Sequence, residues 1–480
     1  MLKSLIVETS RSRLFSFAFK GRRSPQPRKT GLGAFFLVSA SRIQDFLFRN
    51  GEGAENEPHF SVTDTEFAKG EPTMTKPMMT CMGLFVFSMA VVGWLPLPLL
   101  SSVVLAEDDI LANKLNLSLY GYVETSYTQN FNNPTSGVNN NRSFDGDANS
   151  FRPNMAQLVL EKAANPGGAL ADRAGFRLKL NFGEDAKFTG GTGSDDFDFQ
   201  EAYIQYMPAD NLTLQAGRMN TLIGYEVIES PLNPNFSRSF MFGIGEPFTV
   251  TGFRATVDFS ESASLAVSAI NSFTGLQQDD NNSKSIEALL SLTPMDNVGV
   301  SVFGFWGPEG NMRGQATADR MQVGGILDVQ ATDQLEFVLE GYYGNQEVPG
   351  SANARWDGVA GYAIYDFNDQ WGLHVRAEVF EDAAGAFSCF GSDLSSDDGG
   401  NYGELGNAHL CPAWVSAAQD AGTFNQTLWE TTWTLQYKPV PNLITRAEFR
   451  YDRSDRNTFS DGDGVTDSQS TLAGEMIFLF

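Results

Sequence analysis

The sequence predicts an all-β fold, a transmembrane antiparallel β-barrel of about sixteen strands within residues 107–480. Three observations lead to this prediction. Apolar and polar residues alternate along many short segments, and the connections between these segments are alternately long and short. After residue 107, no apolar run reaches the roughly 18 residues that a spanning helix needs.

The composition excludes several classes of function. The 480 residues carry a net charge of −25, and no basic patch offsets that field, which argues against nucleic acid as a partner. Three cysteines exclude a disulfide framework and a Cys-rich metal site. Three histidines leave few candidates for a His-based metal site or catalytic triad. We therefore expect no cofactor and no metal.

The first 106 residues differ from the rest of the chain. Residues 74–106 read as a signal peptide, with a positive start, an apolar core over 83–100 and a cleavage site that ends at Ala106. A retained membrane helix is the alternative, which two prolines in this stretch oppose. Residues 1–73 show no sustained period. We expect them to be an unstructured or mis-assigned extension, with an unusually long leader as the alternative.

Alternation with a period of two is clearest over residues 176–182. Their apolar side chains share one face of a strand, and Arg177 and Lys179 lie on the other. The pattern returns at 335–343, 371–379 and 443–451. A water-soluble sandwich would bury the apolar face, whereas a membrane barrel places it in lipid and the charges in the lumen. The period alone does not choose between them.

The lengths of the connections favour the membrane barrel. We expect strands at 115–129, 151–163, 174–184, 197–207, 211–219, 247–258, 262–273, 284–293, 297–306, 320–330, 334–344, 355–367, 370–381, 425–437, 442–453 and 468–480. Even-numbered connections are short turns, apart from 164–173, and odd-numbered connections are long and polar. Short periplasmic turns and long outer loops are typical of outer-membrane barrels, and an even strand count leaves both termini in the periplasm.

The chain ends in an amphipathic segment with Met476, Phe478 and Phe480 on the lipid-facing side. A terminal aromatic residue in such a strand resembles the signal that the bacterial barrel-assembly machinery reads. We therefore expect that machinery and outer-membrane lipid as partners. An ordinary strand that ends in Phe by chance is the alternative.

Several segments resemble the OmpL-like family of outer-membrane β-barrel porins. They are Gly121–Tyr127, Ala156–Lys162, Gln200–Tyr206, Gly224–Ser230 and Asn233–Ser239. The resemblance covers nearly all of residues 110–480. It implies an outer-membrane channel for passive diffusion of small hydrophilic solutes or ions, with a non-conducting adhesive or structural barrel as the alternative. Trimers are common among barrels of this size, so a homotrimer is one assembly to expect.

The third long connection, residues 220–246, holds many apolar and aromatic residues that would not stay free in water. We expect this loop to fold into the lumen and pack against the barrel wall. There it would project Glu226, Glu229 and Arg238 into a pore constriction, where opposing charges select permeants by field and size. An outer cap or a subunit contact is the alternative.

Charged side chains on the lumen side of the strands are the candidate pore lining. They are Arg177, Lys179, Glu201, Arg254, Glu336, Glu340, Arg376, Glu378, Arg446, Glu448 and Arg450. Water-filled barrels also need polar walls for stability, so each of these residues has a purely structural alternative. The outer loops are acidic and raise the local cation concentration, which favours a preference for cations.

Three remaining patterns carry weaker predictions. Cys389 and Cys411 share the largest outer loop, where we expect a disulfide, with two separate thiols as the alternative. Residues 461–467 have alternating carboxylates like a calcium loop but lack the full ligand series, so we expect a hairpin tip. An enzyme is the main rival class. Because His374 and His409 lie in no catalytic signature, we do not expect one.

Overall fold

The computed structural model describes residues 116–189, 196–273, 281–309, 318–347, 353–383 and 425–480. The predicted N-terminal extension and signal peptide lie outside these residues, and so do Cys389, His409 and Cys411. In the part of the chain that the structure describes, no helix is long and apolar enough to cross a membrane.

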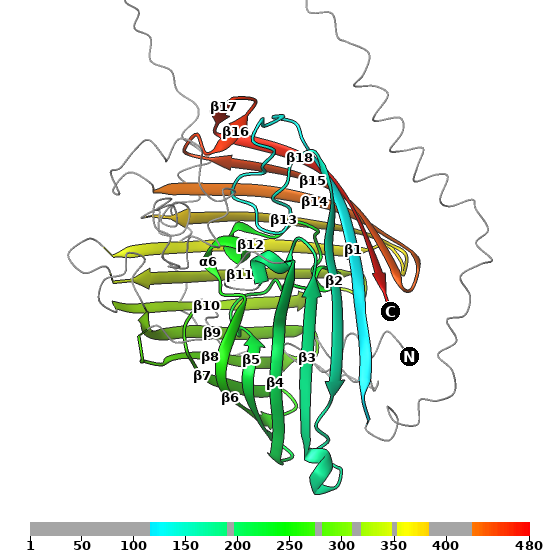
Figure 1. Ribbon diagram of the computed structural model, residues 1–480, viewed down its shortest axis with the longest axis vertical. Coiled ribbons are helices and arrows are strands. Elements are labelled where there is room, and N and C mark those ends of the chain that lie inside the picture. The colour runs from blue at the N-terminus through cyan, green and yellow to red at the C-terminus, as the bar shows by residue number, and fades with distance from the viewer. Residues whose placement is uncertain (1–115, 190–195, 274–280, 310–317, 348–352, 384–424) are drawn as a thin grey trace, which may run out of the picture. The chain divides into compact units, whose positions relative to one another are not determined.

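Sixteen antiparallel strands form a closed barrel, in which each strand pairs with its neighbours in the chain and the last pairs with the first (Figure 1). They are β1 (Ser118–Asn130), β2 (Ser150–Lys162), β3 (Ala174–Phe182), β4 (Phe197–Ala209), β5 (Leu212–Asn220), β6 (Thr249–Ser260), β7 (Ala263–Ile270), β8 (Ser285–Met295), β9 (Val298–Glu309), β10 (Ala318–Gln330), β11 (Leu335–Gln346), β12 (Ala354–Asp366), β13 (Trp371–Asp382), β14 (Gln426–Val440), β15 (Leu443–Ser454) and β18 (Ser468–Leu479). The predicted fold class and strand number are confirmed, and the strand ends differ from the predicted ones by a few residues.

The pairing of β18 with β1 closes the ring. Nine residue pairs join the two strands, from Tyr122 with Leu479 to Asn130 with Thr471. Beyond them, Gly121 and Phe480 exchange two backbone hydrogen bonds, each of 3.1 Å. The terminal residue therefore completes the ladder. In a bilayer core this closure matters, because lipid offers no partner for an unpaired backbone group.

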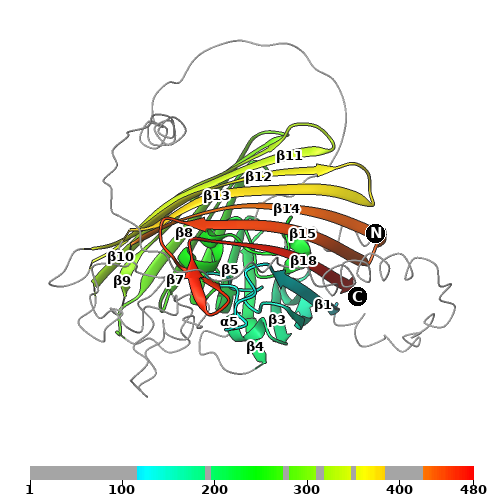
Figure 2. The same cartoon turned by 90° about the horizontal axis from the view of Figure 1, so that it is seen from above.

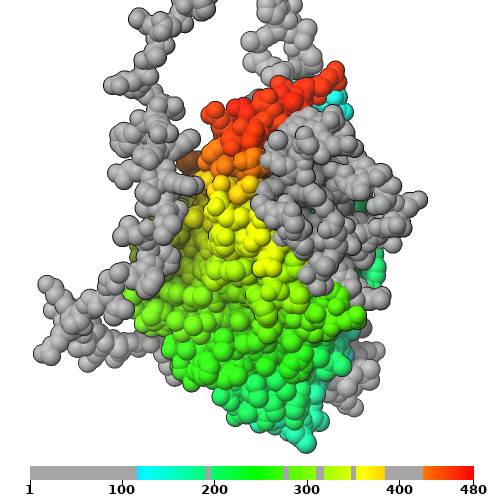
Figure 3. All heavy atoms as spheres, turned by 90° about the vertical axis from the view of Figure 1, so that its left-hand side faces the viewer, coloured from blue at the N-terminus to red at the C-terminus, as the bar shows by residue number. Residues whose placement is uncertain are grey.

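Side chains alternate between the two faces of the wall as the sequence predicts. In β15, Arg446, Glu448 and Arg450 are buried on the inner face, whereas Phe449 and Tyr451 are exposed on the outer face. Seen from above, β11–β14 arch over the side of the barrel opposite β1, β3 and β4 (Figure 2). The space-filling view shows the wall in chain order, from green through yellow to red (Figure 3).

The two ends of the barrel differ in their connections. At one end, here the short-turn end, neighbouring strands are joined by tight turns, except for the link that contains η1 (Leu170–Arg173). At the opposite, long-loop end lie L1 (residues 131–149), L3 (residues 221–248) and the loop with α5 (Ala186–Thr189). The last long loop carries the hairpin of β16 (Phe459–Asp461) and β17 (Gly464–Thr466), so residues 461–467 do form a hairpin tip.

An arginine on the outer face should destabilise the barrel in lipid. Leu339 lies in the middle of β11 and is 51% exposed on the outer wall. Replacement Leu339→Arg is expected to lower the free energy of unfolding by about 2–4 kcal/mol, because the charge enters hydrocarbon. Denaturant titration of the protein folded into phospholipid vesicles measures this. The control Asp333→Arg changes an exposed turn residue. Equal effects of the two substitutions would contradict a lipid-facing wall.

Candidate functional site

L3 lies inside the barrel and packs against its inner wall. The loop contains η2 (Ser230–Leu232) and α6 (Phe240–Gly245), and α6 contacts β12 and β13. In Figure 1, α6 is drawn over β11 and β12. Phe236, Phe240 and Met241 are each at most 1% exposed. The apolar residues that distinguish L3 in the sequence are thus the residues that it buries.

Local sequence gives L3 its shape. Ser239 caps α6, because its hydroxyl accepts a hydrogen bond of 3.0 Å from the Phe242 N–H. Pro231 occupies an early position of η2, where its missing N–H costs nothing. Gly245 is the last residue of α6 and lies against the Tyr342 hydroxyl. A Cβ at position 245 would be 2.1 Å from that oxygen. A larger residue at position 245 would push the helix off the wall.

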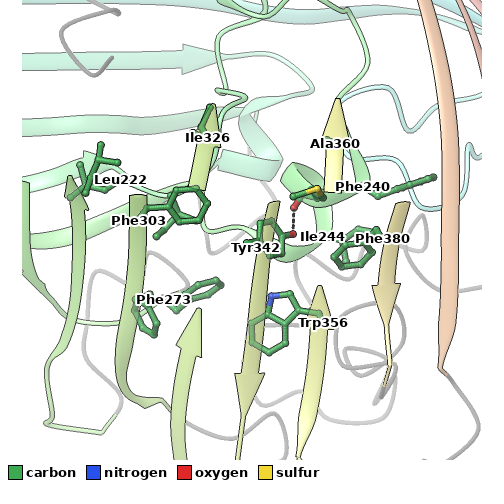
Figure 4. Packing of buried hydrophobic residues seen from close by; sticks show 14 of the residues in the cluster. Leu222, Phe240, Ile244, Phe273, Phe303, Ile326, Tyr342, Trp356, Ala360 and Phe380 are labelled. Carbon is green, nitrogen blue, oxygen red and sulfur yellow. Dashed lines mark hydrogen bonds between the residues drawn. The ribbon is translucent and has the colours of Figure 1, made fainter. Parts of the chain in front are cut away.

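An apolar patch on the inner wall receives α6. Large apolar side chains point inward from successive strands; the patch comprises Phe303, Phe305, Ile326, Val338, Tyr342, Trp356, Tyr362 and Phe380. Figure 4 shows Ile244 beside Tyr342 and Phe380, with the hydrogen bond from the Tyr342 hydroxyl to the Met241 carbonyl oxygen, 2.9 Å long. The alternation pattern predicts charged residues on the lumen side of the strands, and it did not predict this apolar patch. The patch stabilises L3 by removing apolar area of both surfaces from water.

Carboxylates on the wall bind backbone N–H groups of L3. Glu448 accepts from Phe236 at 2.7 Å and from Ser237 at 3.0 Å. Glu340 accepts from Tyr225 at 3.0 Å. Glu378 accepts from the first two residues of α6. The wall carboxylates thus supply hydrogen-bond acceptors of the kind that regular secondary structure would otherwise provide.

Arginines on the wall donate hydrogen bonds to carboxylate and carbonyl oxygens of L3. Arg376 pairs with Glu226 at 2.7 Å and donates to the Ser237 carbonyl oxygen at 2.6 Å. Arg446 donates to the Asn233 carbonyl oxygen at 2.7 Å. Arg450 donates to a carbonyl oxygen of the same loop at 2.5 Å. Predicted lining residues of β13 and β15 therefore hold the loop in place.

A second group of predicted residues meets L3 on the opposite wall. Lys179 lies between Glu201, at 2.7 Å, and Glu229 of L3. Gln200 also donates to Glu229, at 2.8 Å. Burial alone would raise the pKa of Glu229, but the Lys179 ammonium outweighs it and the pKa lies below its ordinary value. Glu229 therefore stays ionised.

These residues border a hollow of about 190 Å³ between L3 and the inner wall. Its charged lining is Arg177, Lys179, Glu201, Glu229 and Arg254. Arg177 also pairs with Glu161 at 2.9 Å, and Arg254 pairs with Glu287 at 2.7 Å. The hollow thus gathers five of the predicted pore residues, with charges of both signs.

The three predicted constriction residues differ in surroundings. Arg238 donates to the carbonyl oxygens of Val227, Ile228 and Phe236 at 2.5–3.0 Å, so it holds L3 in its own fold. Glu226 pairs with the wall, and only Glu229 among the three borders the hollow. All three are at most 5% exposed. Their role in selecting permeants stays a prediction.

L1 also folds inward, although the sequence predicts that the odd-numbered connections are long, polar outer loops. Arg142 pairs with Asp452 of β15 at 2.6 Å and is 1% exposed. Phe144 packs against Phe188 of α5 and Phe242 of L3, with ring centroids 5.7 and 5.9 Å apart. A polar loop can be buried in this way because its side chains find partners inside the barrel. In the sequence, the one hint of this inward fold is the large apolar Phe144 within a run of polar residues.

Two further predicted residues have separate positions. His374 is 4% exposed, and its Nδ1 lies 2.6 Å from the Pro234 carbonyl oxygen of L3. Its Nε2 lies 3.3 Å from Asp366. This histidine therefore belongs to the contacts that hold the loop. Glu336 lies near the short-turn end of β11 and is half-buried.

Acidic residues outnumber basic ones inside the barrel. Of the buried charged residues on described strands, twelve are acidic and eight are Lys or Arg. The buried loop residues add Asp145, Asp185, Glu226, Glu229 and Glu246 against Arg142 and Arg238. The interior therefore carries an excess of carboxyl groups, beyond those that the arginines pair with.

Comparison with known proteins places the barrel among porins. A family model described as "Putative beta-barrel porin-2, OmpL-like" matches residues 116–480. An anion-selective porin from Comamonas acidovorans is 9% identical over 76% of this chain and 99% of that chain, with a TM-score of 0.50. The outer membrane channel DcaP of Acinetobacter baumannii is 14% identical over 76% and 97% of the two chains, with a TM-score of 0.47. No curated protein matches the sequence.

Removing a wall arginine should cost more stability where it holds L3 than where it lies near the surface. Arg376 is fully buried between Glu226 and Glu430. Arg376→Met is expected to lower the free energy of unfolding by about 3–5 kcal/mol, because it leaves buried carboxylates unpaired. The control Arg355→Met breaks half-exposed pairs with Asp357 and Glu381 and should cost at most about 1 kcal/mol. Denaturant titration of both variants checks this, and similar losses would contradict the anchoring role.

Proposed function

Because the chain belongs to the OmpL-like family of β-barrel porins, it forms a channel for passive diffusion across the outer membrane, and we propose that L3 is the constriction that small hydrophilic solutes or ions must pass. One observation carries this proposal. L3 crosses the interior and is bound on both sides, by Arg376 and Glu378 of β13 and by Lys179 of β3. A loop held in this way fixes the narrowest cross-section of the channel.

Some charged residues only anchor L3 in this proposal, and others also face the permeant. Glu226 and Arg238 hold the loop, because their charged atoms are used by the wall and by the loop's own carbonyl groups. Lys179, Glu201 and Glu229 border the hollow and present charge to passing solutes. Charges at a narrow passage select permeants because little water is present to screen them.

We also propose that the channel prefers cations. The support is the excess of buried acidic residues on strands and loops alike. A lumen with an excess of negative charge concentrates cations and raises their rate of entry. The ion pairs lower the effective charge but do not remove the excess.

A non-conducting adhesive or structural barrel is the second candidate. The observation that favours it is the filling of the interior by L1, α5 and L3, with Phe144 against Phe188 and Phe242. A barrel that only displays loops would need this packing and no passage beside it. Discrete current steps in a planar bilayer support the channel, whereas silence of the folded protein supports the second candidate.

Three expectations about topology stay predictions. We propose that the short-turn end faces the periplasm and that the barrel-assembly machinery recognises Phe480. We also propose that the folded protein is a homotrimer. The first gains support from the chain itself, because β1 begins and β18 ends at the same end of the barrel. Accessibility of a C-terminal tag in intact cells and chemical cross-linking of the folded protein test these points.

Shortening L3 should widen the channel. Replacing residues 226–244 by a short Gly-Ser linker is expected to raise the single-channel conductance at least about twofold, because the loop sets the narrowest cross-section. Planar-bilayer recording measures it. As a control, shortening the 163–169 turn removes exposed or half-buried residues at the short-turn end and should leave the conductance unchanged. Unchanged conductance after loss of L3 would contradict its role as the constriction.

Charge substitutions beside the hollow should move the ion preference in opposite directions. Glu229→Gln removes a negative charge and is expected to lower the cation-to-anion permeability ratio, whereas Lys179→Met is expected to raise it. Reversal potentials in a salt gradient give the ratio for each variant. Glu261→Gln, in the exposed turn between β6 and β7, is the matched control and should leave the ratio near that of the wild type. Shifts of the same sign in both variants would contradict electrostatic selection at this place.

A further inference from the structure

A cluster of buried carboxyl groups lies where L3 meets the wall at β11 and β13. Glu226 and Glu246 belong to L3, and Glu340 and Glu378 belong to the wall. Each is at most 6% exposed. Three of them accept hydrogen bonds: Glu226 from Arg376 and from a backbone N–H, and Glu340 and Glu378 from backbone N–H groups of L3. The fourth, Glu246, is different.

Among the described residues, no donor group gives a hydrogen bond to either carboxyl oxygen of Glu246. The carboxyl group lies against Gly224, where a Cβ would be 1.8 Å from its Oε2, so the first and last parts of L3 touch at this point. The carboxyl group of Glu340 lies within reach of a hydrogen bond to it. Two carboxylates repel each other, and they can form a hydrogen bond only when one of them carries a proton.

Within the part of the chain that the structure describes, neither oxygen of Glu246 is bonded to a cationic group that could replace that proton. The groups that act on Glu246 are Glu226 of L3, Glu340 and Tyr342 of β11, and Glu378 of β13. Tyr362 of β12 and Arg376 of β13 interact with the same glutamates of this cluster. Arg376, the cation among them, bonds Glu226 and Glu430. Burial, followed by the negative charges of Glu340 and Glu226, raises the pKa of Glu246 well above its usual range. The packed structure therefore favours the protonated form of this carboxyl group.

We propose that one proton shared by Glu246 and Glu340 latches L3 to β11, and that its loss releases the loop and widens the channel. This inference rests on L3 being the constriction, as proposed above. It gives the channel a proton-dependent gate inside the barrel, separate from the charges that border the hollow. The gate needs no bound ligand other than the proton.

The sign follows from the raised pKa of Glu246. In the released loop the carboxyl group meets water and regains an ordinary pKa, so release is accompanied by loss of the proton. The packed loop is therefore favoured at low pH, and its advantage declines as the pH rises above the ordinary carboxyl range towards the raised value. Within that range the released fraction should grow about tenfold per pH unit.

Trypsin cleavage after Arg238 tests the latch without any measurement of current. Arg238 is the single Lys or Arg between residues 219 and 253, and its guanidinium is buried while L3 is packed. Wild type should be cleaved there increasingly as the pH rises, relative to Glu246→Gln at the same pH. The amide is neutral at every pH, so that variant keeps its loop packed. Taking the ratio at each pH removes the pH dependence of trypsin itself.

Bilayer conductance from about pH 5 to about pH 10 provides the second readout. Wild type and the exposed control Glu261→Gln should open with rising pH, whereas Glu246→Gln should keep an unchanged conductance. If Glu246→Gln does not fold, Glu340→Gln removes the repulsion between the two carboxylates from the wall side. This variant should then show neither cleavage nor conductance that changes with pH.

The two readouts separate the latch from the channel. Equal pH profiles of wild type and Glu246→Gln in cleavage, or no cleavage at any pH, overturn the latch. A pH-dependent cleavage ratio in a barrel that carries no current supports the latch and overturns L3 as a channel constriction. A current that does not depend on pH, with a flat cleavage ratio, leaves the channel standing and removes the gate.

Discussion

Hydrocarbon offers no partner for a backbone N–H or C=O group, and the structure of this barrel depends on that constraint. Sixteen strands satisfy it by pairing in a closed ring, and the bonds between Gly121 and Phe480 extend the pairing to the last residue. Closure also fixes the direction of every side chain, since alternate residues must face lipid and lumen. The inner face that results carries the residues that bind L3.

A ring of sixteen strands encloses more space than the inward side chains of its wall can fill. L1, α5 and L3 occupy much of it, and L3 is held by two kinds of interaction. The apolar patch that includes Tyr342 and Phe380 gives attraction without direction. Hydrogen bonds from Arg376 and to Glu448 give direction, because each fits one part of the loop. Together they place an irregular segment at a fixed position without a regular sheet or long helix.

Burying charges inside the barrel is costly unless each finds a partner, and this requirement shapes the electrostatics of the passage. Arg376 and Lys179 each bridge a carboxylate of the wall and one of L3. The charge that a permeant meets is therefore smaller than the formal count suggests. Glu246 lacks such a partner, and its position against Glu340 makes protonation the available way to bury it.

The sequence by itself determined the barrel, the strand number, the inward positions of residues such as Arg376 and Glu448, and the unusual character of L3. These follow from local rules, because alternation, turn residues and loop lengths are written along the chain. Only the tertiary structure decided that L1 folds inward, that Phe303 and Tyr342 form an apolar patch in a polar lumen, and which charges pair. Those outcomes depend on which residues from distant strands meet across the interior, and a periodic pattern gives the face on which a side chain lies but not its partner on the opposite wall.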